Sequence, residues 1–133
     1  MTVINPELRY RWLWLLIGYL MIAVVVYLSL TSEPVDVDTG LPYEDKLFHL
    51  LAYFCLTFWF IQLYHIKHHV YFWVVLFIGL GVLLEYLQGY DANRYSEFGD
   101  MIANTVGVMA AFMLSSTHLK FVLQKFERWT GLN

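Results

Sequence analysis

Long apolar segments separated by short polar segments dominate this chain. Residues 12–32 carry no charged side chain, and further apolar stretches follow at about residues 46–65, 70–88 and 98–117. Because an α-helix rises about 1.5 Å per residue, about 20 apolar residues span the hydrocarbon core of a bilayer. The pattern therefore predicts four transmembrane helices, the first over residues 12–31.

A cleaved signal peptide is the alternative interpretation of the first segment. The apolar part of a signal peptide is normally only about 7–15 residues long, and a small-residue cleavage site follows it. Here the apolar run is longer and ends in S-L-T-S-E-P. We therefore expect an uncleaved first helix.

The last part of the chain, about residues 118–130, has too few apolar residues to cross a membrane. Its apolar residues recur at helical spacing, with polar and basic residues between them. This pattern predicts an amphipathic helix that lies in the membrane interface or continues the fourth helix. The apolar positions are Leu119, Val122, Phe126 and Trp129, and the polar ones are Lys120, Gln124, Lys125 and Arg128.

Composition supports a single membrane domain over residues 1–133. The chain is 59% hydrophobic and only 14% charged, with a mean hydropathy of +0.55, whereas about a quarter of the residues of a soluble domain are charged. The few basic residues are scattered and the pI is about 5.9, which argues against a nucleic-acid partner. The sequence holds no cofactor motif, so we expect no cofactor, and it does not predict an oligomeric state.

The histidines also predict no metal site. His65, His68 and His69 lie close together, but no cysteine or carboxylate accompanies them. Structural metal sites usually have four protein ligands, so the three histidines could form only part of one. We therefore interpret residues 65–69 as a solvated turn between two antiparallel helices.

The basic residues predict the orientation of the helices. Short cytoplasmic loops of membrane proteins are enriched in Lys and Arg. Of the eight Lys and Arg, only Lys46 and Arg94 fall in the other two loop regions. Both termini are therefore expected in the cytoplasm, together with the 65–69 turn. The basic residues on that side are Arg9, Arg11, Lys67, Lys120, Lys125 and Arg128.

Polar side chains recur at helical spacing in the last three predicted helices. Residues three, four or seven positions apart lie on one face of a helix. Such polar faces on three helices at one depth are unlikely to contact lipid, so we predict a polar pocket that opens on the outer side. The residues are Lys46, His49 and Tyr53; Glu85 and Gln88; and Glu97, Asp100 and Asn104.

A row of small residues accompanies the polar face of the fourth helix. Ala103, Gly107, Ala111 and Ser115 follow one another at four-residue spacing. Small residues in such rows let two helix backbones approach closely in lipid. We therefore expect this side of the helix to face the rest of the bundle.

A purely structural role for the polar residues is the main alternative to a functional pocket. Lys46 and Arg94 could neutralise Glu85 and Asp100, with His49 and the amide side chains completing the hydrogen bonds. Such a network would fix the register of the helices. Ionisable residues inside membrane segments are nevertheless usually functional, and we favour a pocket.

These residues resemble the VanZ-like family of small bacterial membrane proteins. The family pattern D-K-x-x-H-x-x-x-Y is met by Asp45, Lys46, His49 and Tyr53. The family pattern has a second block, which consists of E-x-x-Q, an Arg in the following loop, and then D-x-x-x-N-x-x-G. The chain matches this block at each of these positions. The resemblance covers roughly residues 10–117. The second block comprises Glu85, Gln88, Arg94, Asp100, Asn104 and Gly107.

The resemblance implies a four-helix protein of the bacterial inner membrane that serves the cell envelope. The family's namesake is associated with low-level resistance to teicoplanin, a glycopeptide antibiotic with a lipid tail, but the family implies no agreed reaction. We expect the pocket to bind membrane lipids or a lipid-linked or lipid-tailed ligand. The alternatives are an enzyme that uses His49, Glu85 and Asp100 as its acid and base groups, and, less favoured, a small transporter.

Overall fold

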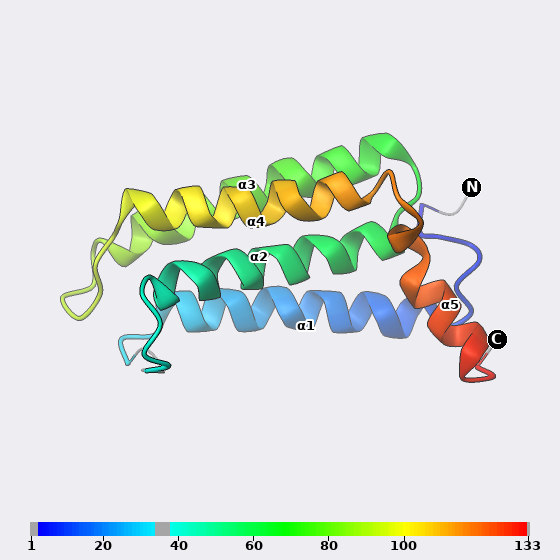
Figure 1. The fold of residues 1–133 in the computed structure, drawn as a ribbon, viewed down its shortest axis with the longest axis horizontal. Helices are drawn as coiled ribbons and strands as arrows, with labels where there is room; N and C mark the ends of the chain where they lie inside the picture. Colours follow the sequence, from blue (N-terminus) through cyan, green and yellow to red (C-terminus); the bar gives the residue numbers. More distant parts are fainter. Residues whose placement is uncertain (1–2, 34–37, 133) are drawn as a thin grey trace.

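The computed structural model describes residues 3–33 and 38–132, and these residues form helices and no strand (Figure 1). The prediction of an all-helical protein is confirmed. Residues 34–37, in the predicted first loop, lie outside the described residues. The elements are α1 (Arg11–Leu30), α2 (Glu44–Leu63), α3 (Lys67–Gln88), α4 (Phe98–Leu114), the short 3-10 helix η1 (His118–Phe121) and α5 (Val122–Trp129).

Three of these helices, α1, α2 and α3, are long and apolar enough to cross a membrane. Helix α4 has 17 residues. It reaches a comparable length only together with the segment His118–Trp129, from which it is bent by 83°. The described residues therefore contain three candidate spans, or four if this bent pair counts as one. The fourth helix ends at Leu114 rather than at the predicted residue 117, because the chain turns there.

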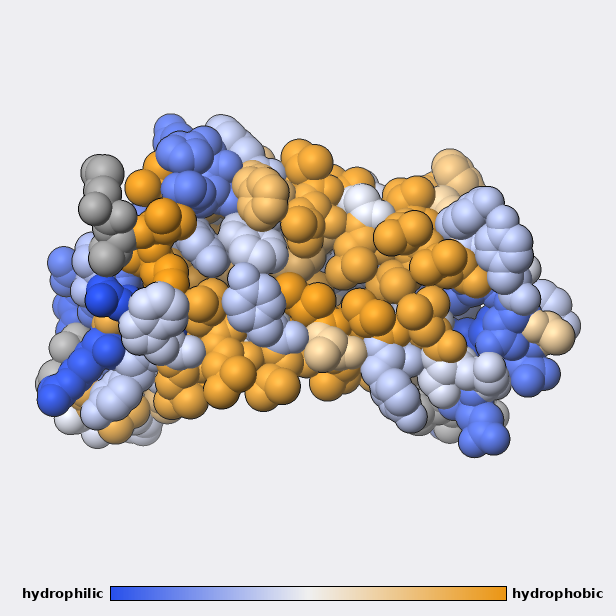
Figure 2. Space-filling model, turned by 180° about the vertical axis from the view of Figure 1, so that it is seen from behind, coloured by the Kyte–Doolittle hydropathy of each residue, from blue (hydrophilic) through white to orange (hydrophobic). Residues whose placement is uncertain are grey.

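The long helices run side by side, and both ends of the chain lie at the same end of the molecule (Figure 1). We call this the terminal end. The opposite end, where α1 and α3 finish and α2 and α4 begin, is the distal end. A space-filling view shows apolar surface across the middle of the molecule and hydrophilic side chains gathered at both ends (Figure 2). This distribution is typical of a protein surrounded by lipid.

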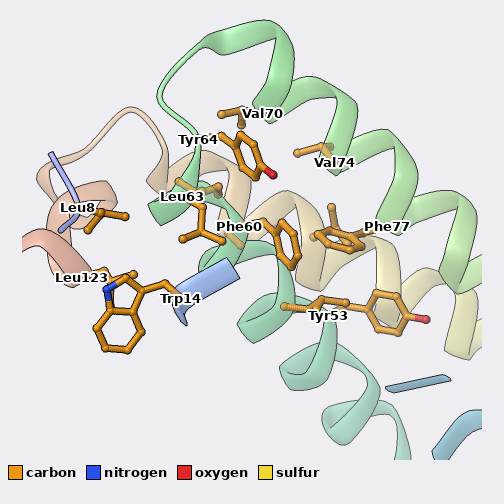
Figure 3. Packing of buried hydrophobic residues seen from close by; sticks show 14 residues of the cluster. Leu8, Trp14, Tyr53, Phe60, Leu63, Tyr64, Val70, Val74, Phe77 and Leu123 are labelled. Atoms are coloured by element: carbon orange, nitrogen blue, oxygen red, sulfur yellow. The ribbon is translucent and has the colours of Figure 1, made fainter. Parts of the chain in front are cut away.

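Aromatic and aliphatic side chains form the core, and the aromatic ones gather between α1, α2 and α3 (Figure 3). Phe60 of α2 lies at its centre. Its ring centroid is 4.2 Å from that of Trp73 and 5.1 Å from that of Phe77, both on α3. Gly18 of α1 approaches the same ring so closely that a Cβ atom there would lie 3.0 Å from Phe60 Cζ. The core therefore holds these three helices together along the half of the molecule nearer the terminal end.

Helices α4 and α2 form the helix pair with the most extensive contact, and their backbones approach closely at Gly107. A Cβ atom added to Gly107 would lie 2.3 Å from the backbone oxygen of Leu50. Ala103 and Ala111, one helical turn away on either side, are buried. The predicted small-residue row thus lies against α2, and no larger side chain fits at Gly107.

The C-terminal helix α5 buries a polar face, which was not predicted from the sequence. Glu127 is completely buried, and its carboxylate accepts hydrogen bonds from the backbone N–H groups of Arg9 and Tyr10, at 2.9 and 3.0 Å, and from the indole of Trp14. The carboxylate thereby satisfies backbone donors at the start of α1, which have no partner within that helix. The predicted apolar face, including Phe126 and Trp129, remains exposed.

The fit at Gly107 leads to a test with a matched control. Gly107→Ala forces the backbones of α2 and α4 apart, and overpacking of this kind costs about 1–3 kcal/mol. Gly79→Ala is the control, because a Cβ atom at Gly79 meets nothing within 4 Å. We expect thermal unfolding of the purified protein in detergent to occur at a lower temperature for Gly107→Ala and at an unchanged or higher temperature for Gly79→Ala. Equal stability of the two variants would contradict this packing.

Candidate functional site

The predicted pocket residues gather at the distal end, although they come from four separate segments. Helix α2 contributes its first turns, α3 its last turn, α4 its first turns, and the loop between α3 and α4 adds one residue. In that order the residues are Asp45, Lys46, His49 and Tyr53; Glu85 and Gln88; Asp100 and Asn104; and Arg94.

Lys46 lies at the centre of an acidic group. Its Nζ atom is 2.6 Å from Glu97 Oε2, 3.2 Å from Asp100 Oδ1 and 3.5 Å from Asp45 Oδ2. The Lys46 side chain is 29% exposed and that of Asp100 only 8%. The ion pair with the buried Asp100 therefore fixes α2 against α4, while the contacts to Asp45 and Glu97 are closer to solvent.

His49 contacts two residues of α4. Its Nδ1 atom is 3.0 Å from Asn104 Oδ1, and its Nε2 atom is 3.8 Å from Asp100 Oδ2. Because an amide oxygen only accepts hydrogen bonds, Nδ1 carries the proton in this contact. The Nε2 atom on the other side of the ring faces Asp100.

Glu85 is the most deeply buried acid of the site, with 1% of its surface exposed. Its Oε1 atom accepts a hydrogen bond of 2.8 Å from the backbone N–H of Glu97. Its Oε2 atom has no hydrogen-bonding partner among the residues that the structure describes, and the same holds for the hydroxyl of Tyr53. Buried polar groups in proteins are nearly always paired. These two unpaired groups therefore mean that the polar residues do not form a fully satisfied network.

The ion pairs that a purely structural role would require are formed only in part. Lys46 neutralises Asp100, but neither Lys46 nor Arg94 pairs with Glu85. Within residues 3–33 and 38–132, the guanidinium of Arg94 has no carboxylate at ion-pairing distance. Gln88 instead donates to the backbone oxygen of Ser29, which connects α3 to the last turn of α1.

A pocket of about 620 Å³ opens among these residues. His49, Tyr53, Gln88, Arg94 and Asp100 line it, together with Asp45, whereas Lys46, Glu85 and Asn104 do not. One wall is apolar and was not predicted, because apolar residues of a membrane helix give no sequence signal of a site. This wall comprises Val25 and Leu28 of α1 and Phe48 and Ala52 of α2.

A second pocket, of about 630 Å³, lies at the terminal end, where no site was predicted. His65, Lys67 and Lys120 are among the residues that line it. Burial and the neighbouring Lys120 lower the pKa of His65, and its ring stacks on that of Phe121 with centroids 5.5 Å apart. In the predicted solvated turn of residues 65–69, His65 is thus only partly exposed, while Lys67 and His68 are exposed.

Two groups of side chains at the distal end have the donor atoms to hold a metal ion, although no metal site was predicted there. The ligand atoms of His49, Glu85 and Asp100 lie within 4.8 Å of one another, and so do those of Asp45, Glu97 and Asp100. Neither group was apparent from the sequence, because each combines residues from helices that are far apart along the chain.

Neither a family model nor a curated protein nor a solved structure matches the chain significantly. The resemblance to VanZ-like proteins, and the function that it implies, therefore remain hypotheses. What the chain does has to be argued from the geometry of the pocket.

The loop that carries Arg94 into the pocket is held to the end of α1 by Asp91. Its carboxylate accepts hydrogen bonds from the hydroxyl of Ser32, at 2.6 Å, and from the backbone N–H of Asn93, at 2.8 Å. Both bonds favour the charged carboxylate and lower the pKa of Asp91 below its usual value.

We expect Ser32→Ala to raise the pKa of Asp91 toward the usual value of 3.8. Because the pKa is lowered in the folded protein, the stabilisation is present above the usual value and is lost as the pH falls through the lowered one. NMR titration of the Asp91 carboxyl carbon measures the change. Ser116→Ala is the control, since that hydroxyl donates to the Met113 backbone at the terminal end. An unchanged pKa in Ser32→Ala would contradict the contact.

Proposed function

We propose that the protein is a multi-pass protein of the bacterial inner membrane, with α1 to α4 crossing the bilayer as a bundle and both termini in the cytoplasm. The distribution of Lys and Arg supports this orientation, because Arg9, Lys67 and Lys125 all belong to the terminal end. Helix α5 lies in the interface in this arrangement. Its exposed Phe126 and Trp129 support that position, since such residues insert at the boundary between headgroups and acyl chains.

In this orientation the distal pocket opens at the outer leaflet, and we propose that it binds the polar headgroup of a lipid-linked or lipid-tailed envelope ligand. The observation that carries the proposal is the guanidinium of Arg94, which lines the pocket together with apolar residues and has no carboxylate at ion-pairing distance among the described residues. A guanidinium binds a phosphate through two parallel hydrogen bonds. The apolar side chains of Val25 and Leu28 offer a surface for the adjoining lipid chain.

Lys46 has a different role from Arg94 in this proposal. Its ammonium group is already surrounded by carboxylates, so it orients Asp100 rather than receiving a phosphate. Glu44 and Glu97, which also line the pocket, have oxygens that can accept hydrogen bonds from sugar hydroxyls or an amine. A ligand that combines a phosphate, a sugar and a lipid chain fits this mixture of groups.

Tolerance of teicoplanin is the cellular outcome that we propose on the basis of the VanZ-like resemblance. Teicoplanin carries a lipid tail, so it shares a membrane anchor with the envelope lipids that the pocket is proposed to bind. A protein that engages such molecules at the outer leaflet would change how much of the drug reaches its target. Glycopeptides without a tail would be affected less.

A membrane-embedded enzyme that acts on a lipid-linked substrate is the second candidate. The observation that favours it is the position of His49, whose Nε2 atom faces Asp100 beside the buried Glu85. An imidazole beside two carboxylates has the geometry of a general acid or base that transfers a proton to or from a substrate. Turnover of lipid phosphates or diphosphates by the purified protein would distinguish this candidate from a binding protein.

The test of the headgroup proposal compares Arg94→Gln with Arg128→Gln, which changes an exposed arginine at the terminal end. The probe is a polyprenyl phosphate added to the protein in nanodiscs, and the matching polyprenol without phosphate is the ligand control. Charge-assisted hydrogen bonds contribute about 1.5–3 kcal/mol, so we expect Arg94→Gln to weaken phosphate binding by about 10–100-fold. Arg128→Gln should bind like the wild type.

Equal affinity of both variants for the phosphate, or equal affinity of the wild type for polyprenyl phosphate and polyprenol, would contradict the proposal. The same variants, produced in a teicoplanin-sensitive bacterial host, also test the cellular outcome. Wild type and Arg128→Gln should raise the teicoplanin concentration that inhibits a sensitive host, and Arg94→Gln should not. A similar effect on a tail-less glycopeptide would exclude the lipid tail as the feature that matters.

A further inference from the structure

We propose that His49, Glu85 and Asp100 bind a divalent first-row transition metal ion beside the distal pocket, which His49 and Asp100 line. The three residues come from α2, α3 and α4, so the site requires the assembled helices. The inference concerns the same pocket as the headgroup proposal but does not depend on it, because metal binding can be measured without any lipid.

The spacing of the donor atoms fits one ion. A tetrahedral ion with bonds of about 2.0–2.2 Å holds its ligand atoms about 3.4 Å apart. His49 Nε2 and Asp100 Oδ2 are separated by 3.8 Å, and all three donor atoms lie within 4.8 Å of one another. Small side-chain rotations would bring them to bonding distance.

Each of the three residues has a ligand atom that is not used by the hydrogen bonds described above. Asn104 occupies the Nδ1 side of His49 and leaves Nε2 as an acceptor. Oε1 of Glu85 is taken by the backbone N–H of Glu97, while Oε2 has no partner among the described residues in spite of nearly complete burial. Oδ1 of Asp100 is taken by Lys46. Acceptors gathered in this way repel one another, and one cation would satisfy them all.

Each proposed ligand is also held in place by a further group. Metal-binding histidines commonly donate their other ring N–H to an oxygen, which fixes the tautomer and the ring orientation. Asn104 does this for His49. Lys46 and the backbone of Glu97 orient the two carboxylates in the same manner. The donor atoms are thus oriented before any ion binds.

The second acidic group, Asp45, Glu97 and Asp100, does not support a metal site. The ammonium group of Lys46 already lies among these carboxylates, at 3.5, 2.6 and 3.2 Å respectively. A divalent ion at the same position would be repelled by this charge. The group of His49, Glu85 and Asp100 differs, because the only lysine or arginine that forms an ion pair with it among the described residues is Lys46, through Asp100 Oδ1.

One imidazole nitrogen and two carboxylate oxygens favour Zn²⁺, Mn²⁺ or Fe²⁺ over Ca²⁺, which takes 6–8 oxygen ligands. Three protein ligands leave at least one coordination position for another molecule, as in catalytic zinc sites. Because His49 and Asp100 line the pocket, that position would face its interior. A phosphate bound by Arg94 could then also contact the ion.

The test measures metal binding to the full-length protein in detergent. Protein treated with EDTA and dialysed would be titrated with Zn²⁺ or Mn²⁺ alone, and bound metal would be quantified by mass spectrometry together with the unfolding temperature. We expect about one ion per chain and a higher unfolding temperature. His49→Ala, Glu85→Gln and Asp100→Asn should abolish this binding, and Asn104→Ala should weaken it by about 10–100-fold.

Glu44→Gln is the matched control, because Glu44 lines the pocket outside the proposed ligand set. It should bind metal like the wild type, as should Arg94→Gln, which separates this site from headgroup binding. Wild-type protein that binds neither ion, or Glu85→Gln that binds as well as the wild type, would overturn the proposal. The wild-type titration decides the question even if a ligand variant fails to accumulate.

Discussion

The close approach of α2 and α4 at Gly107 is the constraint on which the rest of the distal end depends. A side chain at this position would collide with the backbone of Leu50, so only glycine lets the two helices meet at this distance. Because Asp100 and Asn104 lie on the same side of α4, the contact places them against Lys46 and His49. In a bilayer, apolar side chains gain little by contacting another helix instead of lipid. Close backbone packing and interhelical hydrogen bonds therefore drive the association of helices there.

The polar cluster differs from a purely structural network in the groups that remain unpaired. A network that only fixes helix register would satisfy its buried members, since an unpaired buried polar group costs about 1–3 kcal/mol. Here the Glu85 Oε2 atom and the Tyr53 hydroxyl have no partner among the described residues, and the guanidinium of Arg94 forms no ion pair with a carboxylate of those residues. Unsatisfied acceptors next to an open pocket are the arrangement expected of a site that receives a ligand.

Much of this arrangement follows from helical spacing alone. Apolar runs located the helices to within a few residues, and polar faces three and four positions apart identified most of the residues that meet at the distal end. The sequence could not reveal the pairing of Glu127 with the start of α1, because a lone acid in an amphipathic tail resembles a solvated one. The apolar wall formed by Val25 and Leu28 was also missed, since lipid-facing and pocket-facing residues have the same composition in a membrane helix.

The central claim is that the polar residues of α2 and α4 act as one unit, and a double-mutant cycle between His49 and Asn104 tests it most directly. The unfolding free energies of the wild type, His49→Ala, Asn104→Ala and the double variant give the coupling between the two side chains. Residues in direct contact show coupling energies of about 0.5–3 kcal/mol, and we predict a value in this range. If the losses of stability in the two single variants add up to the loss in the double variant to within about 0.3–0.5 kcal/mol, the two side chains are not coupled and the account is contradicted.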